Sequence, residues 1–202
     1  MTIEEEILLF DQQCELLNGF IRELSVIGRD EISSNHRFLA EATMFQLFRS
    51  YERFVRFTFL HYCVHFQSFS GRPVISRLKC DRWEVAEDIL KSSNKFLDWG
   101  NVDSVKQIAN LVFEGGFPVN DLISPVFSTL KDMQRFRNYI AHDSREAEDG
   151  FRKAREQYVR VGSPMPQTVG ELAVYRRTAR ADITIKIVFG KVSKLGDLLK
   201  TL

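Results

Sequence analysis

Apolar side chains recur at helical spacing over an unusually long stretch of this chain, from Ser33 or Ser34 to Gly71. No proline or glycine interrupts the stretch until Gly71 and Pro73 end it. The pattern predicts one helix of more than about thirty residues. A helix with one apolar face must be covered by other elements, and this one is long enough to organise a whole fold.

The other periodic segments are helical as well. Thr2 with Glu5 forms a capping box at the start of the chain, and Thr168 with Glu171 forms a second one. Alternation of apolar and polar residues over 183–187 is also compatible with a strand. The expected helices cover residues 2–28, 33–71, 81–96, 102–113, 124–142, 144–161 and 168–199.

Short connections join these segments, and no internal repeat appears in the chain. Because 44% of the residues are hydrophobic, with seventeen Phe, the chain can fill a real core. We therefore expect an all-α fold, an antiparallel helical bundle with additional peripheral helices, as a single domain across residues 1–202.

The charge balance constrains possible partners. Twenty-eight basic and twenty-seven acidic residues give a formal net charge of +1, so an RNA site would have to be a local patch. Three cysteines without C-x-x-C spacing indicate a reducing compartment. The acidic start over 4–6 is unlike a signal peptide, and charged or polar residues interrupt the apolar stretch 54–69. We expect a cytoplasmic protein with no membrane association.

The most informative motif is Arg137-Asn138-Tyr139-Ile140-Ala141-His142. Five residues turn an ideal helix by roughly 500°, which leaves Arg137 and His142 roughly 140° apart. Asn138 and His142 share a face, and the long arginine side chain could reach them if the helix ended near His142. Asp143 and Ser144 favour such an end. Arginine can bind a phosphate through two N–H groups, and a neighbouring imidazole can give or take a proton near neutral pH. Together they indicate a reaction on a phosphodiester.

A simpler interpretation of the same motif is a surface arginine and a histidine at a helix C-terminus, where a positive charge is favourable. Glu52 allows two interpretations as well. It lies between Phe48 and Val55 on an apolar stripe, where a carboxylate needs a basic partner such as Arg137. Alternatively, it pairs locally with an arginine of its own helix.

Arg49, Arg53 and Arg56 form a basic ridge that could hold an RNA backbone. Further arginines follow in the C-terminal third, but acidic residues lie among them, which is also typical of a solvated surface. His61 and His65 have the i, i+4 spacing of a metal pair, but no third ligand accompanies them. No phosphate-loop or nucleophile-elbow pattern occurs either, so we expect no metal and no cofactor.

Together, the helical pattern, the acidic residue of the long helix and the 137–142 motif resemble the HEPN superfamily. Its hallmark is an R-x(4–6)-H motif that commonly begins Arg-Asn. The motif wording and the preceding stretch Leu97–Asp103 are most similar to the RiboL-PSP-HEPN and related bacterial defence branches.

The resemblance implies a metal-independent endoribonuclease of toxin–antitoxin or antiphage systems, acting as a homodimer and controlled by an antitoxin or defence-system partner protein. It assigns Arg137 and His142 as the catalytic pair, Asn138 as an orienting residue and Glu52 as their acidic partner. One departure concerns regulation. In a related branch, a tyrosine two residues after the histidine is modified, and Ser144 stands at that position here.

Two other functional classes remain open from the sequence. The chain could be a non-catalytic HEPN-like module that binds RNA, a nucleotide or a protein. It could also be a structural dimer in which a Glu52–Arg137 pair is a buried brace.

Overall fold

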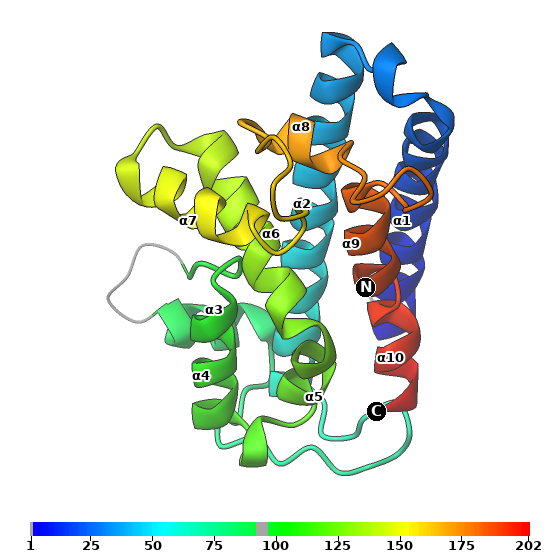
Figure 1. Ribbon diagram of the computed structural model, residues 1–202. Coiled ribbons are helices and arrows are strands. Elements are labelled where there is room, and N and C mark those ends of the chain that lie inside the picture. The colour runs from blue at the N-terminus through cyan, green and yellow to red at the C-terminus, as the bar shows by residue number, and fades with distance from the viewer. Residues whose placement is uncertain (1, 92–96) are drawn as a thin grey trace. The chain divides into compact units, whose positions relative to one another are not determined.

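The computed structural model describes residues 2–91 and 97–202. Within these ranges every named element is a helix, which confirms the predicted all-α class (Figure 1). Extended pairing among the described residues is limited to isolated bridges. The elements are α1 Ile3–Val26, η1 Arg29–Glu31, α2 Ser34–Val64, α3 Trp83–Lys91, α4 Val102–Val112, η2 Glu114–Gly116, α5 Val119–Ile123, η3 Ser124–Val126, α6 Phe127–Ala141, α7 Arg145–Arg155, α8 Val169–Ala173, α9 Thr184–Val192 and α10 Leu195–Thr201.

The two long helices follow the sequence prediction closely at their starts. The Thr2 backbone N–H donates to Glu5 Oε2 at 2.7 Å and the Glu5 N–H donates to Thr2 Oγ1 at 3.2 Å, which completes the predicted capping box of α1. Helix α2 has 31 residues. It ends at Val64, seven residues before Gly71, because the chain folds back in a turn in which Gly71 adopts a φ of 87°.

The described chain divides into two compact units, and it passes between them four times: within α1, within α2, at the start of α6 and between α9 and α10. Of the described residues, the first unit contains 2–11, 50–91, 97–127 and 194–202, and the second contains 12–49 and 128–193. The single domain expected over 1–202 stays a prediction. Among the described helices, none is both long enough and apolar enough to cross a membrane.

Aromatic side chains fill the core of the first unit. Phe10 of α1 stacks on Phe54 of α2, with ring centroids 4.5 Å apart. Phe59 lies 5.3 Å from the Trp99 ring and 4.9 Å from the Phe113 ring. Such contacts bury large apolar areas and explain why α2 keeps one continuous apolar face.

The second unit is built around α6 and its contacts with α7. Phe136 of α6 is fully buried and meets Phe151 of α7 edge-on, with centroids 6.2 Å apart. Tyr139, one turn further along α6, stacks on the same Phe151 ring at 4.4 Å. These aromatic contacts fix α6 near the end that carries the sequence motif.

Several predicted boundaries differ from the structure. The final helix expected over 168–199 is three helices. The first break follows α8, where the Thr184 N–H donates to the Tyr175 carbonyl at 2.9 Å and the intervening residues loop out. The stretch 183–187, predicted as helix with a strand as the alternative, is helical from Thr184, the first residue of α9. Helix α7 ends at Arg155, six residues before the predicted Val161. The predicted end of the third helix at Phe96 lies outside the described residues.

Short helix α8 approaches α2 closely at Gly170. The Gly170 N–H donates to Glu41 Oε2 at 3.1 Å, and a Cβ at this position would lie 2.4 Å from the Arg37 carbonyl oxygen. Because the Arg37 carbonyl belongs to the backbone of α2, it cannot move aside easily for a side chain at position 170. Only glycine fits this approach.

We predict that Gly170→Ala lowers the free energy of unfolding by about 1–3 kcal/mol through overpacking. Gly190→Ala is the matched control, because nothing lies within 4 Å of its Cβ position inside α9. That variant should instead gain about 0.5–1 kcal/mol from the removal of a helical glycine. Urea unfolding of both variants measures the difference, and equal stabilities would contradict the close-approach explanation.

Candidate functional site

The motif lies where α6 ends. Helix α6 stops at Ala141, and the His142 N–H still donates to the Asn138 carbonyl at 2.9 Å, which completes the last turn. Ser144 then caps α7 by accepting from the Ala147 N–H at 3.2 Å. The helix break predicted from Asp143 and Ser144 is confirmed.

Three motif side chains lie together at this break. The Arg137 Nη1 donates to Asn138 Oδ1 at 3.1 Å and lies 3.4 Å from His142 Nε2. Arg137 and Asn138 are half-buried, and His142 is exposed. The arginine side chain therefore reaches across the roughly 140° that separates it from the histidine on an ideal helix.

The contact has a chemical consequence for His142. A guanidinium can only donate, so Nε2 would accept in this contact in the ring tautomer that carries its proton on Nδ1. An imidazole with an unprotonated, exposed Nε2 can accept a proton from a bound molecule. The neighbouring guanidinium can bind an anion at the same place.

Tyr139 holds the middle of the motif against the loop that contains Gln167, a contact that the sequence did not predict. Its hydroxyl donates to the Gln167 carbonyl at 3.0 Å, while its ring stacks on Phe151. Arg155 of α7 reaches the same loop, because its Nη1 donates to the Pro166 carbonyl at 2.7 Å. The motif helix, α7 and this loop form one connected support.

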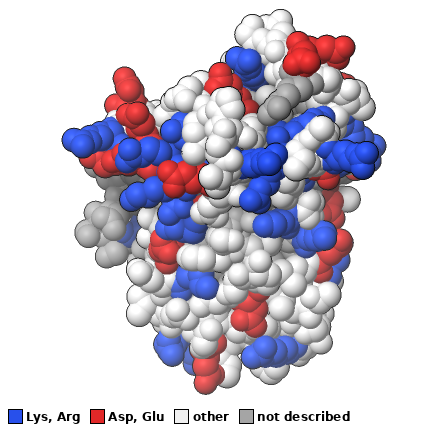
Figure 2. Space-filling model, viewed as in Figure 1, with Lys and Arg blue, Asp and Glu red and all other residues white. Residues whose placement is uncertain are grey.

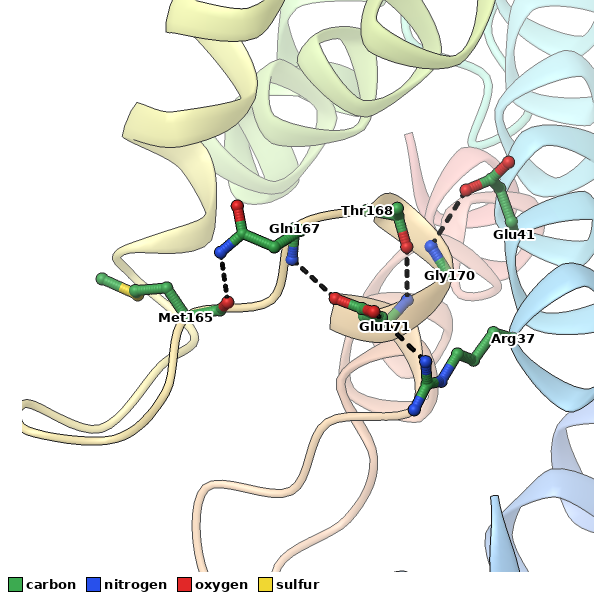
Figure 3. Close-up of polar contacts among 7 residues, drawn as sticks. All are labelled: Arg37, Glu41, Met165, Gln167, Thr168, Gly170 and Glu171. Carbon is green, nitrogen blue, oxygen red and sulfur yellow. Dashed lines mark hydrogen bonds and ion pairs between the residues drawn. The ribbon is translucent and has the colours of Figure 1, made fainter. Parts of the chain in front are cut away.

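Figure 3 shows how the loop itself is held. The Gln167 side chain donates to the Met165 carbonyl at 2.7 Å, and the Gln167 N–H donates to Glu171 Oε2 at the same distance. Glu171 also pairs with Arg37 of α2 at 3.2 Å. Thr168 accepts from the Glu171 N–H at 3.1 Å, as its capping-box pattern predicted, so the loop enters α8 in a fixed direction.

Glu52 belongs to the first unit, where it is half-buried on α2. Arg137 belongs to the second unit. The pairing of these two residues therefore stays a prediction, as does the role of Glu52 in a site.

Two arginines of the predicted basic ridge have carboxylate partners within the first unit. Arg56 binds Glu87 through two hydrogen bonds, of 2.9 and 2.6 Å, and these bonds hold the pKa of that carboxyl below its usual range. Arg53 pairs at 3.2 Å with Glu6, whose burial nevertheless raises its pKa. An RNA phosphate would have to compete with these carboxylates. Arg49 lies exposed in the second unit, and RNA binding by the ridge stays a prediction.

The two histidines near the end of α2 also lie together. The rings of His61 and His65 are 4.2 Å apart. Burial, and then the neighbouring His65, lower the pKa of His61 from 6.5 to about 4. In the described ranges, no group of three or more His, Cys, Asp or Glu side chains is placed to hold a metal ion.

Comparisons with protein-family models, with curated proteins and with solved structures found no match to this chain. The motif and its local geometry are therefore the basis for any functional proposal.

We predict that His61 makes unfolding pH-dependent in mild acid. Between pH 6.5 and about pH 4 the unfolded chain binds a proton at His61 that the folded chain does not, so stability falls as the pH falls through this window. Above pH 6.5 His61 is neutral in both the folded and the unfolded chain, so it causes no loss of stability there. His61→Gln should flatten the dependence of the unfolding free energy on pH in this range, as urea titrations at constant ionic strength would measure. Identical slopes for the two proteins would show that His61 is not the group involved.

Proposed function

We propose that this protein is a metal-independent endoribonuclease of the HEPN type, with Arg137 and His142 as its catalytic residues. The observation that carries the proposal is the exposed contact between Arg137 and His142 at the break after α6. A fixed cation and a proton-accepting nitrogen stand side by side there, as cleavage of a phosphodiester requires.

In the proposed reaction, Nε2 of one His142 removes the proton from a ribose 2′-hydroxyl. The 2′-oxygen forms a bond to the adjacent phosphorus, and the bond from phosphorus to the 5′-oxygen breaks. Arg137 stabilises the additional negative charge on the phosphoryl oxygens. A second, protonated imidazole donates a proton to the departing 5′-oxygen. The products are a cyclic phosphate end and a free 5′-hydroxyl end.

One chain carries a single histidine in this motif, while the reaction uses one base and one acid. A homodimer with two-fold symmetry would supply the second His142. Within each motif, Asn138 would act as a positioning residue, because its side-chain oxygen holds the guanidinium of Arg137 at 3.1 Å. Glu52 and the ridge of Arg49, Arg53 and Arg56 are proposed as the acidic partner and as contacts to the RNA backbone.

From the resemblance to defence-associated HEPN proteins, we propose that this activity belongs to a toxin–antitoxin or antiphage system in the cytoplasm. A nuclease of that kind would need an antitoxin or another partner protein to restrain it. Expression of the active chain alone should therefore arrest growth.

We predict that His142→Ala slows RNA cleavage by about 10²- to 10⁴-fold, because it removes the general base. Arg137→Ala should cost about 10²- to 10³-fold through lost charge stabilisation. The assay uses purified full-length protein with a labelled RNA in excess chelator, and it identifies the product ends by mass spectrometry.

His65→Ala and Arg22→Ala are the matched controls, since both residues are exposed and lie outside the motif. Both variants should cleave at the rate of the unmodified chain. Cleavage that persists in His142→Ala, or that requires an added metal, would contradict the proposal. RNA binding without cleavage in the unmodified protein would instead identify a non-catalytic module.

A further inference from the structure

A polar cavity lies in the second unit, along the N-terminal half of α6. Its volume is about 240 Å³. Side chains from α6, from the turn that follows α7, from the loop before α9 and from α9 itself line it. Those that bear on its chemistry are Thr129, Asp132, Tyr158, Arg177, Asp182 and Lys191.

Asp132 forms the buried, polar part of this cavity and is only 2% exposed. Its carboxylate accepts from Arg135 Nη1 at 3.0 Å, from the Tyr158 hydroxyl at 3.1 Å and from Gln157 Nε2 at 3.5 Å. Burial raises the pKa of Asp132, while Tyr158, Arg135 and Lys191 oppose that rise. A carboxylate has about four acceptor positions, so three donors leave one for a ligand hydroxyl.

Thr129 provides a second polar group within the cavity. The residue is 2% exposed and lines the cavity. A threonine hydroxyl can both donate and accept a hydrogen bond, so it can bind a ligand oxygen beside the carboxylate.

The charges around the cavity do not cancel. Arg135 neutralises Asp132, and Lys186 pairs with the other lining carboxylate, Asp182, at 2.7 Å. Arg177 and Lys191 remain, both exposed, and Lys191 lies near enough to Asp132 to lower the pKa of that carboxyl. In Figure 2, basic side chains gather over α9. Counted with the partners Arg135 and Lys186, the charged side chains at the cavity carry a net charge of about +2.

These features select a class of ligand. A phosphate monoester carries a charge of about −1.5 to −2 at neutral pH, which matches two cations better than a single carboxylate does. A guanidinium binds two phosphate oxygens at once, and an ammonium or a hydroxyl can bind a third. A cavity of about 240 Å³ leaves room for a group much larger than a single water molecule, such as a sugar phosphate.

We propose that this cavity binds a phosphate monoester that also carries a hydroxyl group. Arg177, Lys191 and Thr129 hold the phosphate, and Asp132 accepts a hydrogen bond from the ligand hydroxyl. The ligand is either a free sugar phosphate or the phosphorylated end of an RNA strand. This binding site is separate from the motif at the end of α6, and the inference does not depend on RNA cleavage.

The test is isothermal titration calorimetry of the full chain with ribose 5-phosphate, and separately with a 5′-phosphorylated, 2′-O-methylated trinucleotide. Ribose and the unphosphorylated trinucleotide are the reference compounds. We expect at least one phosphorylated probe to bind at least about tenfold more tightly than its reference, because charge-assisted bonds to the phosphate are lost in the latter. The probe that binds more tightly identifies the source of the ligand.

Arg177→Gln and Lys191→Gln should each weaken this binding by about tenfold or more, and the double variant should abolish it. Arg22→Gln and Lys153→Gln remove equal charge from exposed positions elsewhere in the unit and should leave binding unchanged. All four positions are exposed, and circular dichroism verifies that each variant folds. Failure of both phosphorylated probes to bind, or equal losses in the control variants, would overturn the proposal.

Discussion

The end of α6 at Ala141 is the constraint on which the proposed chemistry depends. In a continued α-helix, Arg137 and His142 would point in directions roughly 140° apart. At the end of the helix the long Arg137 side chain reaches across this angle, so its guanidinium lies 3.1 Å from Asn138 Oδ1 and 3.4 Å from His142 Nε2. Ser144 fixes the stop by starting α7 at once.

The surroundings of the motif explain how an exposed group can still be well positioned. His142 itself is exposed, but Tyr139 is bound on both sides, by the Phe151 ring and by the Gln167 carbonyl. These contacts therefore hold the last turn of α6 in place, while the His142 side chain stays accessible to a bound molecule. Buried aromatic contacts provide that support, and the polar groups face solvent.

Helix α6 thus carries two kinds of polar group within one unit. Asp132 is buried and satisfied by three donors, whereas His142 is exposed beside one guanidinium. Although the whole chain is nearly neutral, Arg177 and Lys191 give a local excess of positive charge. Partner selection would then depend on these local patches and not on a long-range field.

Local patterns predicted local features well. The Thr2–Glu5 capping box, the start of α2 and the break after α6 follow from neighbouring residues, and the structure has all three. The break of the last predicted helix depends on a bond between the Tyr175 carbonyl and Thr184, which no periodicity reveals.

The Asp132 cavity was missed for the same reason, since its lining residues come from separate segments of the chain. An aspartate on the buried face of α6 was the one available sign, because a buried carboxylate requires partners.

The most direct measurement is a structure of the full chain bound to a cleavage-resistant, 2′-O-methylated RNA. The proposed mechanism requires one 2′-oxygen within roughly 3.2 Å of His142 Nε2, with the adjacent phosphate bound to Arg137 and a second chain completing the site. An RNA strand bound elsewhere, with these two side chains left in contact only with each other, would contradict it.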